Sequence, residues 1–476
     1  MFFVVNHLIE WVRNLKQADK LPRLISRIIH DLLAAYPAIQ RLLLGYSGGI
    51  DSHVLLHLLA SQRQDWAGRT LTAVYVDHGL QPASAQWGRH CAEVCRTLAV
   101  DFELLRVNAK PPPGESPEAA ARRARYRALE QLVGEGDALL TAHQRDDQAE
   151  TLLLQLLRGA GPHGLAAMPL VAPLGRGLLL RPLLEIERAD IRTYADHHGL
   201  QWIEDISNLS REPDRNYLRH EVLPLLKARW PALSTTLSRS AQLCAEAAVL
   251  LDDLADWDLL QAATERSDCL AISVLWVLSE QRQRNALRRW FRRLQLPPPN
   301  AHHLEHILRD AIAAPRDRQP LIRWPDCEVR RYWEWLYAMA PLPPHDPSRI
   351  FPLAPGLMDL SISNVGRLQL SRVQGQGIRL AALSGAAVTV RFRRGGERFR
   401  PAGRLHSQEL KKLLQEANIP PWERDRLPLL YVNEILAAVI GVGVNAEWAA
   451  RTGEEGMVLE LHGLNRGVVV EYALRT

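Results

Sequence analysis

Short apolar runs alternate with segments of helical periodicity through the first half of the chain. Four of these runs are rich in strand-forming residues and are predicted as strands, at 42–47, 71–76, 102–107 and 137–142. Helical spacing fills the intervals between them, and this alternation is typical of a parallel sheet covered by helices. We therefore predict an α/β fold with a doubly wound, mostly parallel sheet.

Two of the predicted helices have recognisable ends. One begins near residue 117, with Ser116 as N-cap and Pro117 at the first helical position. The other begins near Asp146, and Gly159 is placed to end it.

The pattern changes in the second half. Between 226 and 340 the strand signal fades and helical periodicity rich in Leu, Ala and Arg replaces it, up to a proline-rich segment at 341–347. Short strands at 388–392 and 436–444 then mix with one helix at 407–417, which indicates a small α+β domain. The predicted organisation is an N-terminal extension at 1–37, an α/β domain at 38–225, a helical domain at 226–340, a linker at 341–360 and an α+β domain at 361–476.

Length and composition fit this organisation. A chain of 476 residues is longer than one core usually organises, and 47% hydrophobic with 23% charged residues is ordinary for a globular protein. No apolar run approaches the roughly 18 residues of a membrane span, and the first residues lack the pattern of a signal peptide. We expect no membrane association and a cytoplasmic location.

The charge balance permits a polyanionic partner. The net charge is +5, and only 6 of the 58 basic residues are lysine. Arginine forms paired hydrogen bonds with phosphates and stacks on bases, although genome base composition would produce the same excess of arginine over lysine. The 5 cysteines are scattered and include no CxxC pair, so we interpret them as buried thiols in a reducing compartment.

A glycine-rich turn separates the first predicted strand from the helix after it, with the sequence Ser47-Gly48-Gly49-Ile50-Asp51-Ser52. Backbone N–H groups of such a turn converge on an anion, and the helix N-terminus adds partial positive charge, so phosphate is the expected occupant. The common phosphate loop requires a lysine that this turn lacks. A carboxylate within the turn would repel phosphate unless a cation bridges them, which indicates Mg²⁺ at Asp51.

This turn resembles the PP-loop of the N-type ATP pyrophosphatases. The resemblance implies an adenine nucleotide α-hydrolase-like fold that binds ATP at residues 47–52 and cleaves it between the α and β phosphates. Asp77 and His78 end the second predicted strand, where a further nucleotide contact is plausible.

A second motif lies at 142–161. It places His143 at a strand end and Asp146, Asp147 and Glu150 in the first turn of a helix. Acidic residues there often only complement the helix dipole, but these lie at the sheet edge where ligands of such folds bind. The motif resembles that of the tRNA(Ile)-lysidine synthetases, which implies that Asp147 and Glu150, next to His143, bind the substrate lysine.

Three further segments resemble the same family. Residues 118–129 carry Arg122 with Arg125 and Tyr126, and 205–224 carry Arg215 and Arg219. A solvated basic helix face is the alternative interpretation of both. The third segment, at 396–430, resembles the C-terminal domain of the family. In and around it we expect a tRNA-binding surface formed by Arg391, Arg393, Arg394, Arg398, Lys411 and Lys412.

The resemblance implies a complete reaction. Free L-lysine is ligated to C2 of the wobble cytidine of tRNA(Ile) with a CAU anticodon, through an adenylated cytidine, giving lysidine, AMP and pyrophosphate. Catalytic roles are expected for Asp51, Asp147, Glu150, Arg122, Arg215 and Arg219, with ATP and Mg²⁺ as cofactors. A homodimer is left open.

Three alternatives remain at this point. A PP-loop tRNA thiolase would share the adenylation step but would need cysteines that handle sulfur. A non-catalytic RNA-binding protein would not require Ser47, Asp51, Asp147 and Glu150. A metal enzyme built on the segment 302–306, His-His-Leu-Glu-His, would lack the HExxH spacing.

Overall fold

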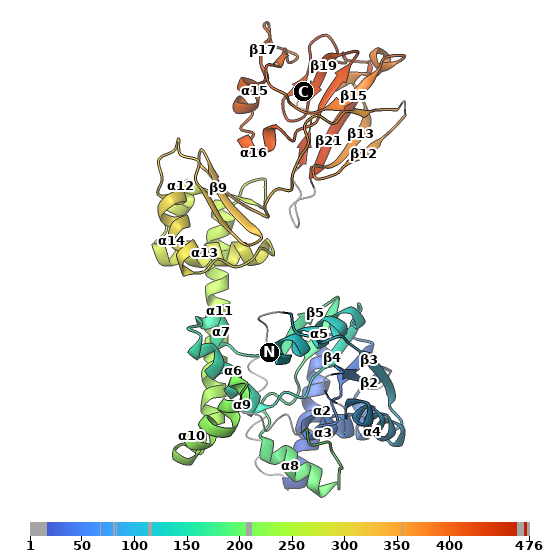
Figure 1. Cartoon of the computed structure of the whole chain (residues 1–476), viewed down its shortest axis with the longest axis vertical. Coiled ribbons are helices and arrows are strands. Elements are labelled where there is room, and N and C mark those ends of the chain that lie inside the picture. Colours follow the sequence, from blue (N-terminus) through green and yellow to red (C-terminus); the bar gives the residue numbers. More distant parts are fainter. Residues whose placement is uncertain are drawn as a thin grey trace. The chain divides into compact units, whose positions relative to one another are not determined.

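The computed structural model describes residues 17–66, 68–79, 81, 83–112, 117–205, 212–354, 356–463 and 471–473. The expectations for Ser116 and for the first 16 residues lie outside the described residues. The chain divides into two compact units, Met1–Val249 and Leu250–Thr476 (Figure 1).

The first unit is built on a six-stranded sheet with the strand order β3-β2-β1-β4-β6-β5. All neighbours are parallel except β5 and β6, which form an antiparallel pair at one edge. The predicted doubly wound, mostly parallel sheet is thus confirmed, with all four predicted strands present. The strands are β1 (Arg41–Gly45), β2 (Thr70–Asp77), β3 (Asp101–Arg106), β4 (Asp137–Leu140), β5 (Val171–Leu174) and β6 (Gly177–Leu180).

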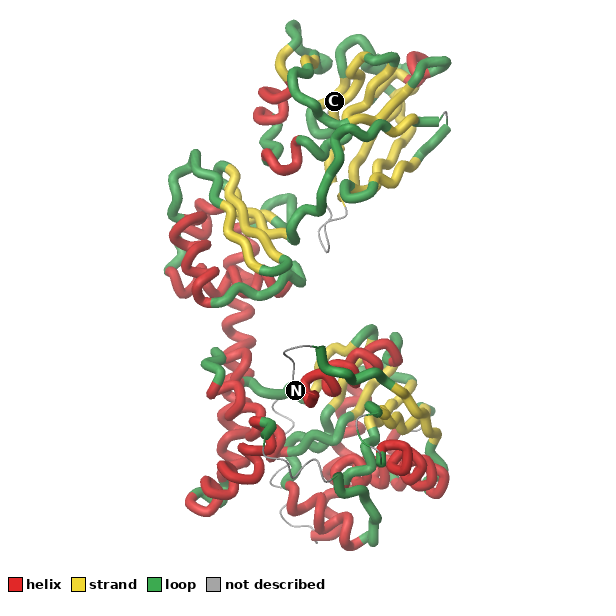
Figure 2. Tube along the Cα trace, viewed as in Figure 1, coloured by secondary structure: helices red, strands yellow, loops and turns green. Residues whose placement is uncertain are grey.

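Helices connect and cover these strands (Figure 2). They are α2 (Gln17–Ala35), α3 (Ile50–Ser61), α4 (Ser84–Thr97), α5 (Pro117–Leu132), α6 (Arg145–Leu157), α7 (Pro162–Leu165) and α8 (Arg188–His197). The helix predicted from Asp146 is confirmed as α6, and Gly159 follows it with a φ of 71°.

Helix α2 belongs to the α/β domain. Its residues Ile25, Ile29 and Leu32 are buried in the same core cluster as Leu44 of β1 and Leu55 of α3. The domain start expected at residue 38 therefore falls too late. That boundary followed the first strand signal, whereas an amphipathic helix before the strand completes the core.

The chain then leaves the sheet through α9 (Asp214–Tyr217), the π-helical turn η3 (Leu218–Val222), α10 (Leu223–Arg229) and α11 (Leu233–Ala262). The turn at η3 continues the helical path from α9 to α10, and Arg215 and Arg219 project from this stretch.

The second unit begins with helices and a small antiparallel sheet of order β7-β10-β9-β8. Its helices are α12 (Ile272–Trp276), α13 (Glu280–Arg293) and α14 (Ala301–His306), which continues into η4 (Ile307–Ile312). The helices expected in this region are present. The pattern did not indicate its strands, which are β7 (Cys269–Ala271), β8 (Leu321–Trp324), β9 (Cys327–Tyr332) and β10 (Trp335–Met339).

Among the described residues, three antiparallel sheets, the smallest of them the pair β16-β17, and two short α-helices form the last part of the second unit. The expected strands and helix are confirmed as β15 (Val388–Arg391), β19 (Ile435–Val439), β20 (Gly443–Val444) and α15 (Leu410–Glu416). The segment expected as a linker contains β11 (Phe351–Pro352) and β12 (Asp359–Ile362), which pair with β15 and with β13 (Gly366–Gln374). The other elements here are β14 (Ile378–Arg379), β16 (Arg398–Phe399), β17 (Gln408–Glu409), α16 (Pro421–Arg424), β18 (Leu429–Val432), β21 (Glu455–Gly463) and β22 (Glu471–Ala473).

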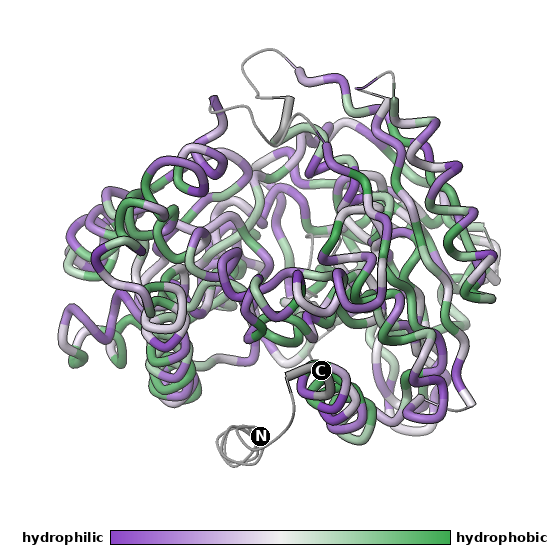
Figure 3. The backbone as a smooth tube through the Cα atoms, turned by 90° about the horizontal axis from the view of Figure 1, so that it is seen from below, coloured by the Kyte–Doolittle hydropathy of each residue, from purple (hydrophilic) through white to green (hydrophobic). Residues whose placement is uncertain are grey.

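Polar and apolar stretches share the same helices, as the mixed colours along the backbone show (Figure 3). Within the described part of the chain, every helix is too short or too polar to cross a membrane.

Candidate active site

The glycine-rich turn lies between β1 and α3, at the carboxyl end of the central strand. Gly48 has a φ of 79°, and a Cβ atom added there would approach Ile203 Cδ1 to 2.5 Å. The Ile203 N–H donates to the Gly48 carbonyl at 2.9 Å, which fixes the far side of the turn. Glycine is therefore required at this position by both conformation and space.

Two hydroxyl groups hold the turn closed. The side-chain oxygens of Ser47 and Ser52 lie 3.1 Å apart, and the Ser52 hydroxyl donates to the Gly49 carbonyl at 3.0 Å. Gly49 caps α3 in an extended conformation without a side-chain cap, so the first N–H groups of the helix face an incoming anion. The geometry is that of a phosphate site.

Asp51 lies in the first turn of α3. Its Oδ1 atom is buried and has no hydrogen-bond partner in the part of the chain that the structure describes. Burial, and next the charge of Asp147, raises the pKa of Asp51 to about 6, while Arg188 and Arg219 oppose the shift. A buried carboxylate oxygen with no donor, next to a second carboxylate, is what a divalent cation would complete.

Asp147 uses its two oxygens differently. Its Oδ2 accepts the Gln144 N–H at 2.9 Å, and the Gln144 side chain accepts the Asp146 N–H at 2.7 Å, which closes a capping box at the start of α6. Its Oδ1 faces Arg219 at 3.0 Å and Arg215 at 3.4 Å. The residue thus both caps the helix and presents one oxygen to the site.

Glu150 lies one turn further along α6 and is fully buried, with 0% of its side chain exposed. Its two oxygens accept hydrogen bonds from Arg215 Nε at 2.7 Å and Arg219 Nε at 2.6 Å. Burial alone would lower the pKa of Arg219, but the bond and charge of Glu150 outweigh it and raise that pKa. One carboxylate therefore fixes two guanidinium groups beside Asp147.

Asp146 binds side chains other than the two arginines. Its Oδ1 accepts from Lys227 Nζ at 2.8 Å and from Ser234 Oγ at 2.6 Å, which ties α6 to α10 and α11. Burial would raise the pKa of Asp146, but these two hydrogen bonds outweigh it and lower the pKa. Sequence reasoning missed Lys227 and Ser234, because nothing near them in the sequence indicates a partner more than 80 residues away.

His143 follows β4, and its Nδ1 lies 2.9 Å from Thr141 Oγ1. Burial lowers the pKa of His143 to about 3, and the charges of Arg181 and Arg215 lower it further. Sequence reasoning also missed Arg181, which follows β6. A signal existed, since β6 ends at the same edge of the sheet, but β6 itself was not predicted.

The remaining expected residues of this edge lie on its flanks. The Arg122 guanidinium lies 5.1 Å from the Tyr126 ring centroid on α5. Asp77 ends β2 and accepts the Gly79 N–H at 2.9 Å. His78 follows it, and its buried Nδ1 accepts or donates no hydrogen bond within the described ranges. Burial, and next the charge of Arg125, lowers the pKa of His78.

The expected tRNA-binding residues belong to the second unit and differ in their pairing. Arg391 forms two hydrogen bonds with Glu434, and Arg393 pairs with Asp425 at 3.3 Å. The side chains of the other two arginines bind carbonyl oxygens, Arg394 that of Ser348 and Arg398 that of Ser407. Lys411 and Lys412 are exposed on α15.

The cysteines and the histidines at 302–306 bear on the two alternative enzymes, the thiolase and the metal enzyme. All five cysteines are free, and burial raises the pKa of Cys91, Cys95 and Cys327 to about 12 and that of Cys269 to about 11. His302 and His306 face each other, with their Nε2 atoms 3.1 Å apart. Nowhere in the described residues do three metal-ligating side chains gather.

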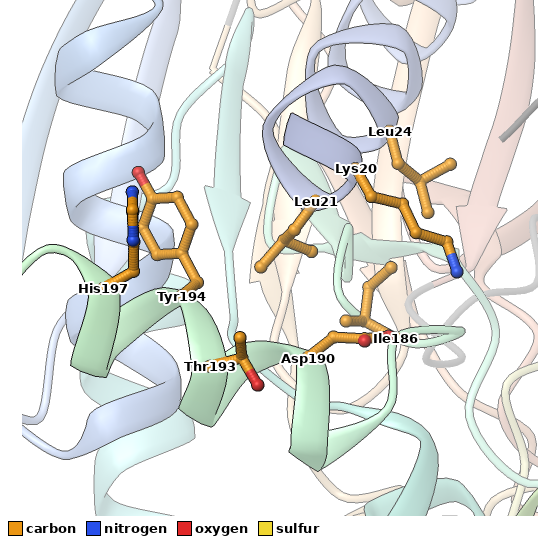
Figure 4. Close-up of a pocket in the computed structure, with 8 residues that line it drawn as sticks. All are labelled: Lys20, Leu21, Leu24, Ile186, Asp190, Thr193, Tyr194 and His197. Atoms are coloured by element: carbon orange, nitrogen blue, oxygen red, sulfur yellow. The ribbon is translucent and has the colours of Figure 1, made fainter. Parts of the chain in front are cut away.

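A small pocket elsewhere in the first unit contains none of the expected residues. It lies between α2 and α8 and is lined by Lys20, Leu21, Leu24, Ile186, Asp190, Thr193, Tyr194 and His197 (Figure 4). The chemistry of the sheet edge is separate from it.

The fold and the turn at 47–52 define a nucleotide-binding enzyme of the PP-loop class. A family model described as a PP-loop domain matches residues 20–226. Models described as the TilS substrate binding domain and the TilS substrate C-terminal domain match residues 270–337 and 388–461. The PP-loop match also begins within α2, in agreement with the packing of that helix.

Curated relatives identify the family. A tRNA(Ile)-lysidine synthase from Coxiella burnetii is 44% identical over 88% of this chain and 92% of its own length. One from Methylococcus capsulatus is 45% identical over 85% of this chain and 91% of its own. The chain belongs to the tRNA(Ile)-lysidine synthase family. Among solved structures, a U34-tRNA thiolase from Methanococcus maripaludis matches 47% of this chain over 78% of its own length. Its sequence is 16% identical and the TM-score is 0.40.

Proposed function

We propose that this chain uses ATP to ligate free lysine to C2 of the wobble cytidine of tRNA(Ile), giving lysidine, AMP and pyrophosphate. One observation carries the proposal. The phosphate turn with Asp51 follows β1, and the helix that carries the arginine-bound Asp147 follows the adjacent strand β4; the charges of the two carboxylates interact. This proximity supports a site for ATP next to a site for an ammonium group.

Mg²⁺ fits this arrangement. Asp51 would hold it, and a single carboxylate suits an ion that usually takes its other ligands from phosphate and water. When bound, the ion would neutralise charge on the phosphates during adenylation. Ser47, Ser52 and the first N–H groups of α3 would bind the phosphates themselves.

Two arginines add positive charge at the same carboxyl edge of the sheet. Arg215 and Arg219 are held by Glu150 and keep 20% and 27% of their side chains exposed. They are placed to stabilise the negative charge that develops as the cytosine C2 oxygen attacks the α-phosphorus. We assign Glu150 the role of positioning them, in addition to its expected place in the lysine site.

Asp147 is the proposed partner of the lysine side chain. The ε-ammonium group must lose a proton before it attacks C2, since its ordinary pKa is about 10.4. Asp147 Oδ1 already faces two cations, so it is placed to bind the ammonium and accept its proton. His143, Arg122, Asp77 and His78 remain proposed contacts of the substrates on either side. Every proposed residue lies in one chain, so the chemistry does not require the homodimer left open above.

The tRNA contacts are proposed on the second unit. Arg394 and Arg398 have no bonded carboxylate among the described residues and lie with Lys411 and Lys412 in the domain matched by the C-terminal family model. Phosphate contacts of this kind fix orientation and make binding salt-dependent.

The reaction is tested with radiolabelled lysine, ATP and unmodified tRNA(Ile). Transfer of label to acid-precipitable RNA that requires all three components supports the proposal. Pyrophosphate release with no lysine transfer would contradict it and favour the thiolase, which the buried, dispersed cysteines do not support.

A further inference from the structure

One arginine at the carboxyl edge of the sheet has no assigned role. Arg181 follows β6 and is 8% exposed, and its buried Nε has no hydrogen-bond partner among the described residues. A buried guanidinium with an unused donor is costly unless an anion completes it.

The protein holds this side chain in place from two directions. Arg181 Nη1 donates to the Pro169 carbonyl at 2.6 Å. The loop that supplies this carbonyl is fixed by Gln148 of α6, whose side chain exchanges two hydrogen bonds with the Met168 backbone, at 2.8 and 2.9 Å. The same helix that carries Asp147 therefore also positions Arg181.

Positive charge accumulates around Arg181. Arg122 and Arg125 stack on the Tyr126 ring at 5.1 and 5.8 Å, and Tyr126 interacts with the Arg181 guanidinium. Burial, with Arg122 adding to it, lowers the pKa of Arg181, whereas Tyr126 opposes the shift. Asp147 and Glu150 accept hydrogen bonds from Arg215 and Arg219, and no carboxylate of the described residues pairs with Arg181.

The position of the cluster selects its ligand. Strand β4 lies between β1, which carries the phosphate turn, and β6, which carries Arg181. At about 4.8 Å per strand, β6 lies about 10 Å from β1, whereas Asp147 follows β4 and lies between them. An ammonium group on Asp147 thus has the ATP phosphates on one side and the arginine cluster on the other.

We propose that Arg181, together with Arg122, binds the α-carboxylate of the free lysine whose ε-ammonium group lies on Asp147. This inference rests on the proposed function. Free lysine matches the charges of the site. Its ε-ammonium group would face the carboxylate of Asp147, and its α-carboxylate would face the guanidinium groups. A bidentate guanidinium also suits a carboxylate in a buried place, where the backbone of a large polynucleotide does not fit.

The test compares lysine with lysinamide, in which a neutral amide replaces the carboxylate. In the wild type, kcat/KM for lysinamide should be about 10- to 100-fold lower than for lysine, the range expected for one charged hydrogen-bonded contact. Arg181→Gln should raise the KM for lysine by a similar factor with little change in kcat, and should leave lysinamide nearly unaffected. The preference for lysine over lysinamide would then largely disappear.

Matched variants separate the alternatives. Arg127→Gln, an exposed position on the same helix as Arg122, should retain the full preference. Equal losses for both substrates in Arg181→Gln would mean that Arg181 is only structural and would overturn the proposal. A raised KM for ATP, or slower adenylation of tRNA without lysine, would identify a phosphate site and overturn it as well.

Two further outcomes are distinguishable. If Arg181→Gln fails to fold, Arg122→Gln decides, because Arg122 is exposed: a reduced preference supports the proposal and an unchanged one contradicts it. If the wild type transfers no lysine at all, the proposed function fails. If it transfers lysine and both arginine variants keep the full preference, only the carboxylate site fails.

Discussion

Replacing Glu150 by glutamine should both destabilise the first unit and slow adenylation. Glu150 has no exposed side-chain surface and accepts a short hydrogen bond from each of two arginines. Glu150→Gln keeps the shape but removes the charge, which leaves two guanidinium groups facing a neutral amide. Breaking a buried ion pair by removing one partner typically costs about 3–5 kcal/mol.

The lower end of that range applies here. Arg215 and Arg219 keep 20% and 27% exposure, so water recovers part of their solvation. A loss of about 3 kcal/mol lowers the transition temperature of a domain of about 150–250 residues by about 6–12 °C. Calorimetry or thermal unfolding followed by circular dichroism measures this directly.

Glu187→Gln is the matched control. Glu187 pairs with Arg145 at 2.6 Å, a distance similar to those at Glu150, but 56% of its side chain is exposed. Its removal should cost less than about 1 kcal/mol. Equal transition temperatures for the two variants would refute the reasoning from burial.

A kinetic measurement separates the two roles of Glu150. If it positions the arginines, Glu150→Gln should slow tRNA adenylation measured without lysine. A rise in the KM for lysine with unchanged adenylation would show that Glu150 acts on lysine alone, and would contradict the positioning role.

Two other predictions concern pH and salt. The folded-state pKa of His143 is about 3 and its unfolded value about 6.5, so the unfolded state takes up the proton first and stability is lost as pH falls below about 6.5. The difference in unfolding free energy between pH 7 and pH 5 should therefore be about 2 kcal/mol smaller in His143→Gln, measured by urea unfolding; an unchanged difference would contradict the buried neutral imidazole. Replacing Arg394 and Arg398 together by alanine should weaken tRNA binding and reduce the salt slope by about 2, with the KM for lysine unchanged; an unchanged slope would remove them from the tRNA surface.

Local sequence patterns were sufficient for four strands of the first sheet and for the turn and helix that carry the candidate site. The strands that alternate with helices, the turn at 47–52 and the helix from Asp146 all follow from neighbouring residues, and each is present. Strands β5 and β6 and the sheet β7–β10 were not indicated. Strand β5 contains Pro173, which weakens a strand signal, and β7–β10 lie in a region where Leu-, Ala- and Arg-rich helical periodicity dominates the pattern. Helix α2 was assigned to an extension because its packing partners lie beyond the first strand.

The candidate site shows the same limit at the level of side chains. Sequence motifs indicated Asp51, Asp147, Glu150, Arg215 and Arg219, but not that Glu150 would be buried under both arginines. Sequence spacing also did not distinguish Asp146 from Asp147. The structure separates these neighbours, because one binds Lys227 and Ser234 and the other presents an oxygen to the site.

This difference between neighbours gives the most direct test of the proposed lysine site. The KM for lysine is measured by label transfer to tRNA(Ile) in Asp147→Asn and in Asp146→Asn. We predict that Asp147→Asn abolishes transfer or raises the KM at least about 10-fold, the effect of losing one charged hydrogen bond. Asp146→Asn should leave the KM nearly unchanged while lowering the transition temperature. Equal effects of the two variants on the KM, or normal lysine transfer by Asp147→Asn, would contradict the assignment of Asp147 to the substrate ammonium.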